Sequence, residues 1–321
     1  MHKYITSLLL TLALLIPQIA VAIDIIAHRG ASGYLPEHTK EAAVLAYMQG
    51  AHYIEQDLVL SKDNHLVVLH DIHIETVTNV EQVYPDRARS DGRFYAIDFS
   101  LSELRHLRVH ERQKRNGEVV FPSRYRGNAH FTIATFAEQV ELIRALNESF
   151  GKQTGFYTEI KTPEWHLEQG KDIALSLANE LKRLSLNQPH SRIFVQSFEP
   201  NSLKRLHADL GVNVPLIQLI AENGWQESSA DYTAMQSAEG LVRISQYAQG
   251  IGPWLPQVVN NNQMTAFYKR AKSAGLLVHP YTFREDVIND NTKAQALFNL
   301  LVQNEVDGLF TDQVKPYMLV E

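Results

Sequence analysis

Residues 23–30 read IDIIAHRG, a short apolar and β-branched run that ends in a histidine, an arginine and a glycine. A run of this composition predicts a buried strand. Pro36 then precedes a helical stretch at 37–49, and Gly50 is suited to end that helix. The stretch therefore predicts a first strand–loop–helix unit, with His28 and Arg29 at the carboxyl end of its strand.

The same alternation continues along the chain. Short apolar strands that alternate with helices are typical of parallel βα units. About eight strands in some 300 residues favour an α/β protein with a (β/α)8 TIM barrel over an open doubly wound sheet. The sequence contains neither a GxGxxG turn after the first strand nor a GxxxxGK[ST] loop, which weakens the nucleotide-binding alternative. We expect further strands at 53–60, 66–69, 155–160, 193–197, 215–220, 276–281 and 308–310, and helices at 137–146, 172–184, 200–209, 264–274 and 293–302.

Two segments depart from this alternation. Residues 1–22 combine Lys3, an apolar stretch at 8–16 and the small-residue end Ala20-Val21-Ala22, which predicts a signal peptide that is cleaved after Ala22. The apolar stretch is too short to span a bilayer, so an uncleaved anchor is the weaker alternative. Within the barrel domain, 23–321, residues 72–131 are rich in arginine and aspartate and lack the strand–helix rhythm. We expect an insertion after an early barrel strand that covers the mouth of the site, with a passive surface loop as the alternative.

Composition narrows the class of protein. A chain with 45% hydrophobic and 21% charged residues is typical of a soluble protein with a sizeable core, without stable insertion into a membrane. The formal net charge of -6 argues against a nucleic-acid-binding protein, although a local site can still be positive and take an anionic substrate. The chain has no cysteine, which excludes disulfides and thiolate metal sites. An exported protein without disulfides fits the periplasm.

Two histidines and two cations lie at expected strand ends. Catalytic side chains of a (β/α)8 barrel lie at the carboxyl ends of its strands, and histidine titrates near neutral pH. We therefore expect His28 and His70 to be the acid–base pair. Arg29 and Lys161 are expected to contact phosphate oxygens, although Lys161 would alternatively only pair with Glu159.

Acidic residues on two expected strands predict a metal site. Glu55 and Asp57 are two positions apart and share one strand face, and Glu159 comes from another strand. These carboxylates would form an oxygen-rich site for Ca²⁺ or Mg²⁺ rather than for zinc. The alternative is that Glu55 and Asp57 face solvent. Phe198 and Tyr281 are expected to line the substrate pocket, with core packing as their alternative role.

These residues stand in segments that resemble the glycerophosphodiester phosphodiesterase family in order along the whole chain after residue 22. The one local departure is Gln313-Val314, where the family carries an aromatic residue and a proline. The matching segments are IAHRGASGYLPEHT (26–39), EQDLV (55–59), VVLHD (67–71), EIK (159–161), VHPYT (278–282) and GLFTD (308–312).

The resemblance implies a (β/α)8 barrel with a small insertion and a divalent metal, most often Ca²⁺ in the periplasmic branch. It also implies hydrolysis of glycerophosphodiesters, such as glycerophosphocholine and glycerophosphoethanolamine, to sn-glycerol 3-phosphate and an alcohol. Either the 2-hydroxyl of the substrate's glycerol or a water would be the first nucleophile. By position, the resemblance makes His28 and His70 the acid–base pair, Glu55, Asp57 and Glu159 the metal ligands, and Arg29 and Lys161 the phosphate contacts.

Two other functions compete with this hypothesis. A related phospholipase-type phosphodiesterase would need an apolar rim or an amphipathic helix for the lipid surface, and the sequence after residue 22 shows neither. A surface binding protein on the same barrel would not need the complete set of ligands and histidines. The sequence leaves the oligomeric state open, a homodimer included.

Overall fold

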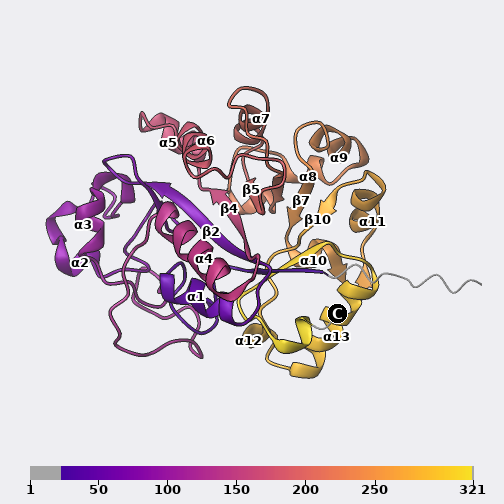
Figure 1. The fold of residues 1–321 in the computed structure, drawn as a ribbon, viewed down its shortest axis with the longest axis horizontal. Coiled ribbons are helices and arrows are strands. Elements are labelled where there is room, and N and C mark those ends of the chain that lie inside the picture. Colours follow the sequence, from indigo (N-terminus) through magenta and orange to yellow (C-terminus); the bar gives the residue numbers. More distant parts are fainter. Residues whose placement is uncertain (1–22, 320–321) are drawn as a thin grey trace, which may run out of the picture.

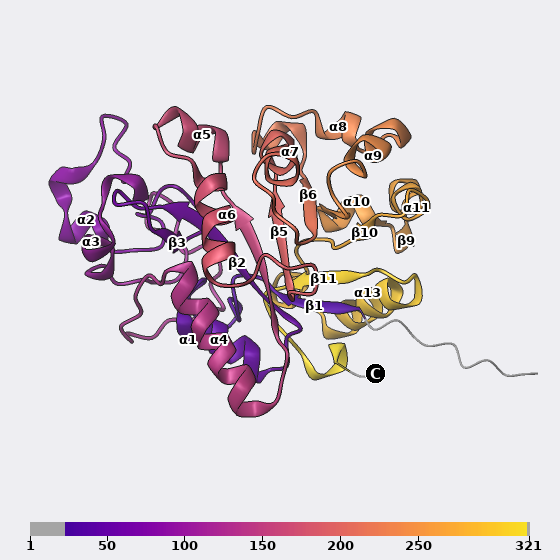
Figure 2. The ribbon, with the colours of Figure 1, turned by 45° about the horizontal axis from the view of Figure 1, so that its top comes forward.

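A ring of parallel strands organises residues 23–319, the part of the chain that the computed structural model describes. Eight parallel strands form a nearly closed barrel, with helices around its outside (Figure 1, Figure 2). The expected α/β class and the (β/α)8 barrel are therefore confirmed. The strands follow the order β10-β7-β6-β5-β4-β2-β1-β11. They are β1 (Asp24–Ala27), β2 (Tyr53–Leu60), β4 (Gly155–Ile160), β5 (Ile193–Ser197), β6 (Leu216–Ile220), β7 (Gly250–Pro253), β10 (Leu277–Val278) and β11 (Gly308–Thr311).

The barrel closes between the short strand β10 and the last strand β11. The backbone N–H of Phe310 donates to the carbonyl of Pro280 at 3.1 Å, and the N–H of Phe283 donates to the carbonyl of Phe310 at 2.8 Å. The extended segment 280–283, which follows β10, therefore makes the hydrogen bonds to β11 that the short strand itself does not make. On its other side, β11 pairs in parallel with β1, and Ala27 is aligned with Thr311.

Helices cover the outside of the barrel. Thr135 begins α4 with a capping box that includes Glu138, and Gly151 ends that helix in the left-handed conformation. The longer helices are α1 (Lys40–Met48), α4 (Phe136–Phe150), α6 (Ile173–Arg183), α7 (Pro200–Ala208), α9 (Ala238–Ile244), α11 (Ala266–Ser273) and α13 (Asn291–Gln303). The shorter ones are α2 (Val80–Val83), α3 (Leu101–Arg105), α5 (Pro163–Glu168), α8 (Tyr232–Met235), α10 (Leu255–Val258) and α12 (Glu285–Ile288).

The sequence predicts the number of barrel strands but misplaces one of them. The run at 66–69 contains β3 (Leu66–Val68), which pairs antiparallel with β2 rather than forming a parallel barrel strand. The connection between the two strands is short, which permits a hairpin but not a crossover. The eighth barrel strand is instead β7, whose sequence GIGP is poor in strand-forming residues. A second small hairpin joins β8 (Val259–Asn260) to β9 (Gln263–Met264).

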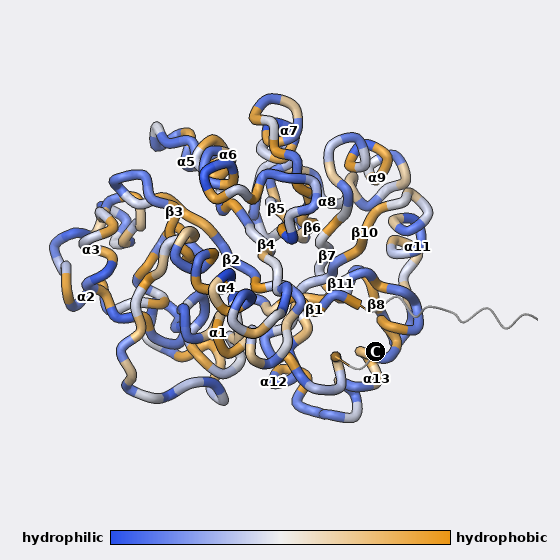
Figure 3. The backbone as a smooth tube through the Cα atoms, in the orientation of Figure 1, coloured by the Kyte–Doolittle hydropathy of each residue, from blue (hydrophilic) through white to orange (hydrophobic). Residues whose placement is uncertain are grey.

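Apolar residues form three separate clusters in the described chain. The largest contains side chains of both the barrel strands and the surrounding helices. Figure 3 shows how hydrophobic and hydrophilic residues alternate along the chain. A small cluster of rings and aliphatic side chains, which includes Tyr157, Phe194 and Phe310, fills the barrel interior. The Tyr157 ring is 4.8 Å from the Phe310 ring and 4.9 Å from the Phe194 ring, measured between centroids. This aromatic layer gives the barrel a packed base.

The third cluster stabilises the segment at 72–131, which lies to one side of the barrel around α2 and α3 (Figure 1). Residues such as Ile74, Phe94 and Phe99 pack there against Val59 of β2 and Val67 of β3. The segment is therefore a folded subdomain with its own apolar core, and not only a charged surface loop.

Two findings concern export and membranes. The predicted signal peptide, residues 1–22, lies outside the described residues. Within 23–319, no helix combines the length and the apolar character that crossing a bilayer requires.

Candidate active site

A cavity of about 220 Å³ opens among the carboxyl ends of the barrel strands. Of the site residues that the sequence predicts, all but Glu55 line it. Glu55 lies buried beside the cavity, where one of its carboxylate oxygens accepts a hydrogen bond from the backbone N–H of Arg29. The predicted lining residues are His28, Arg29, Asp57, His70, Glu159, Lys161, Phe198 and Tyr281, and Gln196, Leu219, Trp225, Glu227, Trp254, Thr282, Arg284 and Phe310 complete the lining.

The turn after β1 is shaped by close packing against helix α1. Arg29 adopts a left-handed conformation with φ of 59°, which non-glycine residues adopt mainly where the surroundings hold them. Gly30 follows with φ of 77°, and a Cβ there would lie 2.8 Å from the backbone of Ala42. The His-Arg-Gly sequence thus permits a tight turn that directs the Arg29 N–H to Glu55, with an N···O distance of 2.6 Å.

Strand register brings the acidic residues together. In the parallel pair β2 and β4, Asp57 is aligned with Glu159. Glu55, two positions before Asp57, is also buried. His38, from the turn before α1, has its Nε2 atom 2.8 Å from Oδ2 of Asp57. The alternative that Glu55 and Asp57 face solvent is therefore wrong.

Burial and mutual repulsion perturb these carboxyl groups. Burial, together with the charge of Asp57, raises the pKa of both Glu55 and Glu159 well above its usual value. For Asp57, burial is outweighed by Lys161 and by the hydrogen bond from His38, so the pKa of Asp57 is well below its usual value. Such a crowded group of carboxyls has a high affinity for positive charge.

The donor set fits a divalent cation. His38, Glu55 and Asp57 each offer one ligand atom, and these atoms lie within 4.8 Å of one another. The Oδ1 atom of Asp57 is buried and has no hydrogen-bond partner among the described residues. Oxygen ligands without sulfur are typical of Ca²⁺ or Mg²⁺ sites. Glu159, which the sequence predicts as a ligand, adds a further carboxylate at the aligned position of β4.

Each of the two predicted catalytic histidines is paired with an aspartate. The Nδ1 atom of His28 lies 2.6 Å from Oδ1 of Asp312, and Nδ1 of His70 lies 2.7 Å from Oδ1 of Asp71. Because each Nδ1 atom is engaged by a carboxylate, the Nε2 atom is the one left for a substrate in the cavity. This is the arrangement in which an imidazole is held for proton transfer.

The surroundings of both histidines favour the neutral imidazole. Burial, with a further effect of the Arg29 charge, lowers the pKa of His28 to about 4 and that of His70 to about 3. A neutral imidazole is a competent base. An anionic substrate in the cavity would favour the protonated form of either ring and thus allow one of them to become the acid.

The two predicted phosphate-binding cations are held in place by carboxylates. One Arg29 nitrogen, Nη1, is 3.1 Å from both carboxylate oxygens of Glu37, and Nε is 3.6 Å from Oδ2 of Asp57. Lys161 donates to Glu159 at 2.7 Å, and although burial disfavours its charge, Glu159 and Asp57 raise the pKa of Lys161. Lys161 therefore does pair with Glu159, and it lines the cavity as well.

The outer side of the cavity is aromatic. Phe198 and Tyr281 are partly buried lining residues, with ring centroids 5.9 Å apart at 90°. Trp225 is 43% exposed and packs edge-on against Trp254 at 5.1 Å. Glu227 also lines this side and makes no hydrogen bond or ion pair with another described residue. A cationic or apolar portion of a ligand would find complementary chemistry here.

Sequence reasoning assigned no role to several residues of this site. Asp312 directly follows β11, so its strand-end position was an available signal. His38 gave no such signal because it lies in a turn before a helix. Trp225, Glu227, Trp254 and Arg284 lie in connections whose composition alone does not distinguish them. No residue of 72–131 is among those lining the cavity, and the expectation that the insertion covers its mouth stays a prediction.

A model of the glycerophosphoryl diester phosphodiesterase family matches residues 28–315, which include every residue of the cavity. The chain belongs to this family. It is an enzyme that hydrolyses glycerophosphodiesters. The family is metal-dependent, in agreement with the cluster of His38, Glu55 and Asp57.

Relatives within the family are similar over most of their length. A glycerophosphodiester phosphodiesterase of Haemophilus influenzae is 37% identical over 315 residues, covering 90% of this chain and 86% of the relative. One from Treponema pallidum is 35% identical over 318 residues, covering 90% and 88%.

Solved structures of the family share the fold. A glycerophosphodiester phosphodiesterase of Agrobacterium tumefaciens aligns with a TM-score of 0.61 at 19% identity, covering 93% of this chain and all of that one. A phosphodiesterase of Oleispira antarctica, solved in complex with the product sn-glycerol-3-phosphate, aligns with a TM-score of 0.59 at 22% identity, covering 91% and 93%.

Proposed function

We propose that this enzyme hydrolyses small glycerophosphodiesters, such as glycerophosphocholine and glycerophosphoethanolamine, to sn-glycerol 3-phosphate and the free alcohol. The observation that carries the proposal is that His28 and His70, each held by an aspartate, line one cavity, next to a group of buried carboxyls and two cations. Acid, base, metal ligands and phosphate contacts are thus available around a single substrate.

The two histidines perform the proton transfers. The Nε2 atom of one accepts the proton of the nucleophile, which is either the 2-hydroxyl of the substrate's own glycerol or a water. The Nε2 atom of the other gives a proton to the oxygen of the leaving alcohol. Asp312 and Asp71 hold the rings through Nδ1 and stabilise the imidazolium that forms during the reaction. Arg29 and Lys161 neutralise the phosphate oxygens as negative charge develops.

Glu55, Asp57 and Glu159, together with His38, would hold the divalent metal. Ca²⁺ is our first choice and Mg²⁺ the alternative, because the set consists mainly of carboxylate oxygens. When bound, the metal supplies Lewis-acid polarisation of the phosphate and lowers the pKa of a nearby hydroxyl. The unpartnered Oδ1 atom of Asp57 supports this assignment.

The size and lining of the cavity support a small, water-soluble substrate. Its volume, about 220 Å³, is below the roughly 300 Å³ at which pockets for drug-sized ligands begin. The aromatic side with Glu227 suits an amino alcohol such as choline or ethanolamine. The complete set of catalytic groups favours an enzyme over a binding protein on the same barrel, and the small cavity favours deacylated substrates over intact phospholipids.

We further propose that the protein acts in the periplasm after removal of residues 1–22. Such an enzyme would convert deacylated phospholipids into glycerol 3-phosphate outside the inner membrane, linking lipid breakdown with glycerol metabolism. The mass of the purified protein from an envelope fraction tests this, because cleavage after Ala22 leaves Ile23 as the first residue.

Product analysis by phosphorus NMR tests the proposed reaction. Incubation with glycerophosphocholine should produce glycerol 3-phosphate and choline, with a cyclic phosphate as a transient signal if the 2-hydroxyl attacks first. Formation of phosphocholine and glycerol would overturn the proposal, because the other ester bond would then be the one cut.

A further inference from the structure

Two arginines of the insertion donate hydrogen bonds to the aspartates of the two His–Asp pairs. Arg112 donates from Nη1 to Oδ2 of Asp71 at 2.6 Å, and Arg124 donates from Nη2 to Oδ2 of Asp312 at 2.7 Å. In both aspartates the other oxygen, Oδ1, is the one that engages the histidine. The two pairs are therefore extended into two Arg–Asp–His chains of the same design.

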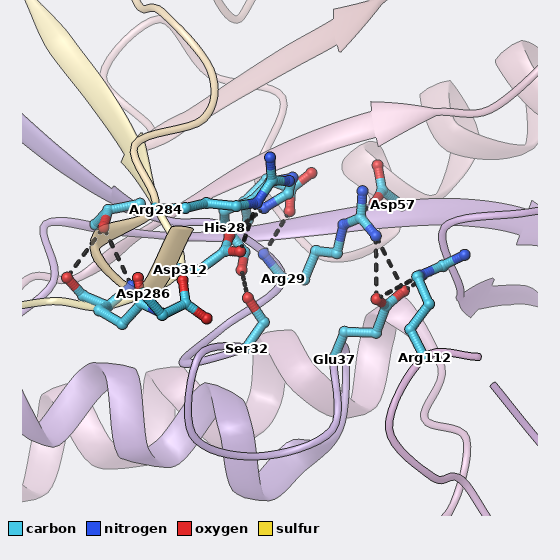
Figure 4. A network of polar contacts seen from close by, with 12 residues as sticks. His28, Arg29, Ser32, Glu37, Asp57, Arg112, Arg284, Asp286 and Asp312 are labelled. Atoms are coloured by element: carbon cyan, nitrogen blue, oxygen red, sulfur yellow. Dashed lines mark hydrogen bonds and ion pairs between the residues drawn. The ribbon is translucent and has the colours of Figure 1, made fainter. Parts of the chain in front are cut away.

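Each arginine is itself held by further contacts. Arg112 forms a two-pronged pair with Glu37, with Nε to Oε2 at 2.8 Å and Nη2 to Oε1 at 2.6 Å, and Glu37 in turn pairs with Arg29. Figure 4 shows Glu37 between Arg29 and Arg112. Arg112 thus contacts Asp71, which holds His70. It also contacts Glu37, which holds Arg29.

Arg124 is almost completely buried, with 3% of its side chain exposed. Its Nε atom donates to Asp286 at 2.8 Å, and its guanidinium carbon lies 3.6 Å from the centroid of the Phe121 ring. Asp312 also accepts from Arg284, a residue that lines the cavity, at 2.8 Å. The contacts with Asp286, Asp312 and the Phe121 ring hold the planar guanidinium group of Arg124 in one orientation.

The local fold of the insertion places the two arginines. They flank a small hairpin in which Gln113 and Val119 form an antiparallel bridge, and the N–H of Val120 donates to the carbonyl of Arg112 at 3.0 Å. The apolar core of the insertion includes Val109 and Phe131, which lie on either side of this hairpin along the chain. The segment contributes no residue to the lining of the cavity, and Arg112 and Arg124 connect it to the two His–Asp pairs.

We propose that Arg112 and Arg124 are positioning residues through which the insertion fixes the orientation of both catalytic imidazoles. The proposal rests on the roles that the proposed function gives to His28 and His70. Holding Oδ2 of each aspartate leaves Oδ1 in one place, and this keeps Nε2 of each ring directed at the reacting oxygens. Small errors in such placement are costly for the rate but affect substrate binding little.

Kinetics of single variants test the proposal. Arg112→Ala and Arg124→Ala should each lower kcat for glycerophosphocholine by about 10-fold to 100-fold while KM changes by less than about threefold. Arg112→Lys and Arg124→Lys should recover part of the loss, because a lysine keeps the charge without the two-pronged geometry. Guanidinium ion at millimolar concentration should increase the activity of Arg112→Ala and leave the unmodified enzyme unchanged. Arg115→Ala and Arg126→Ala, exposed arginines of the same insertion, are the matched controls and should keep kcat.

Proton NMR of the histidine rings gives a second readout that needs no turnover. The Nδ1–H signal of His70 should be lost or exchange faster in Arg112→Ala, and that of His28 should change in the same way in Arg124→Ala, each without effect on the other ring. Unchanged ring signals together with unchanged kcat in both alanine variants would overturn the proposal. An unmodified enzyme that releases no glycerol 3-phosphate would instead contradict the proposed function, and the ring signals would still decide whether the arginines position the histidines.

Discussion

Oδ1 of Asp312 lies 2.6 Å from Nδ1 of His28, although the two are 284 positions apart along the chain. The register of two neighbouring strands explains the contact. Ala27 of β1 is aligned with Thr311 of β11, so the next residue on each strand, His28 and Asp312, emerges side by side at the rim of the barrel. The parallel pairing of the first strand with the last is therefore what builds this catalytic pair.

Removing the charge of Asp312 should slow catalysis without preventing folding. Asp312→Asn keeps the shape of the side chain but no longer stabilises the protonated form of His28. We expect kcat for glycerophosphocholine to fall by about 10²-fold to 10⁴-fold, the range over which a positioned acid or base contributes. Asp172→Asn, which removes an ion pair with Arg205 on the outer helices, is the control and should keep kcat. Equal losses in both variants would contradict a specific role for Asp312.

Neutralising the buried carboxylates should remove metal binding. In calorimetry with Ca²⁺, Asp57→Asn and Glu55→Gln should each weaken binding by at least about 10-fold, and chelation should abolish activity in the unmodified enzyme. Glu159 belongs to the ligand set expected from the sequence, and His38 belongs to the cluster that the structure shows. The Ca²⁺ affinities of Glu159→Gln and His38→Gln distinguish these two sets. Glu180→Gln, on the outside of α6, is the control. Unchanged affinity in Asp57→Asn would contradict the assignment of the metal site.

The aromatic side of the cavity should recognise a cationic alcohol. Replacing Trp225 by alanine, or Glu227 by glutamine, should raise KM for glycerophosphocholine by about twofold to fivefold, corresponding to about 0.5–1 kcal/mol for a cation beside an exposed aromatic ring. Glycerophosphoglycerol carries no positive charge, and its KM should change little. Steady-state kinetics with both substrates provide the comparison. Parallel changes for the two substrates would show that these residues do not distinguish the charge of the alcohol.

Acid should destabilise the protein through His166, a buried histidine that does not line the cavity. His166 accepts from the N–H of Leu60 at its Nε2 atom, and its Nδ1 atom is 3.0 Å from the carbonyl of Thr162, so the ring is neutral. Burial lowers the pKa of His166 to about 4, whereas an unfolded histidine has its ordinary value of about 6.5. Between these values only the unfolded chain takes up the proton, so the free energy of unfolding decreases as the pH falls.

Urea unfolding at pH 7 and pH 5 measures this effect. Between these two pH values, the unmodified protein should lose about 2 kcal/mol more than His166→Gln, a variant whose side chain cannot titrate. Equal losses in the two proteins would show that His166 does not contribute to the acid sensitivity.

Residue type and strand-end position were sufficient to predict half of the residues that line the cavity. The alternation of strands and helices predicted the barrel, and eight of the nine predicted site residues line one cavity. The ninth, Glu55, supports the turn that carries Arg29. A strand such as β7 could not be predicted, because Gly250 and Gly252 leave space for neighbouring side chains instead of providing apolar bulk of their own.

The contacts that could not be predicted from the sequence are those between residues that lie far apart along the chain. Nothing near Arg112 or Arg124 indicates that their partners are Asp71 and Asp312, because these contacts arise only after the insertion folds onto the barrel. Charged residues in a turn-rich segment usually face water, and that general tendency fails here at two arginines. His38 was missed for a similar reason, since its contact with Asp57 depends on the packing of α1 against the turn after β1.

The most direct test of the account is the release of glycerol 3-phosphate from glycerophosphocholine by residues 23–321, measured with chelator, with added Ca²⁺ or Mg²⁺, and in the His28→Ala variant. We predict turnover that requires the metal and falls by at least about 10²-fold in the variant. Turnover that persists in His28→Ala, or that is indifferent to chelator, would contradict the central claim that His28 and a metal held by buried carboxylates act together at this cavity.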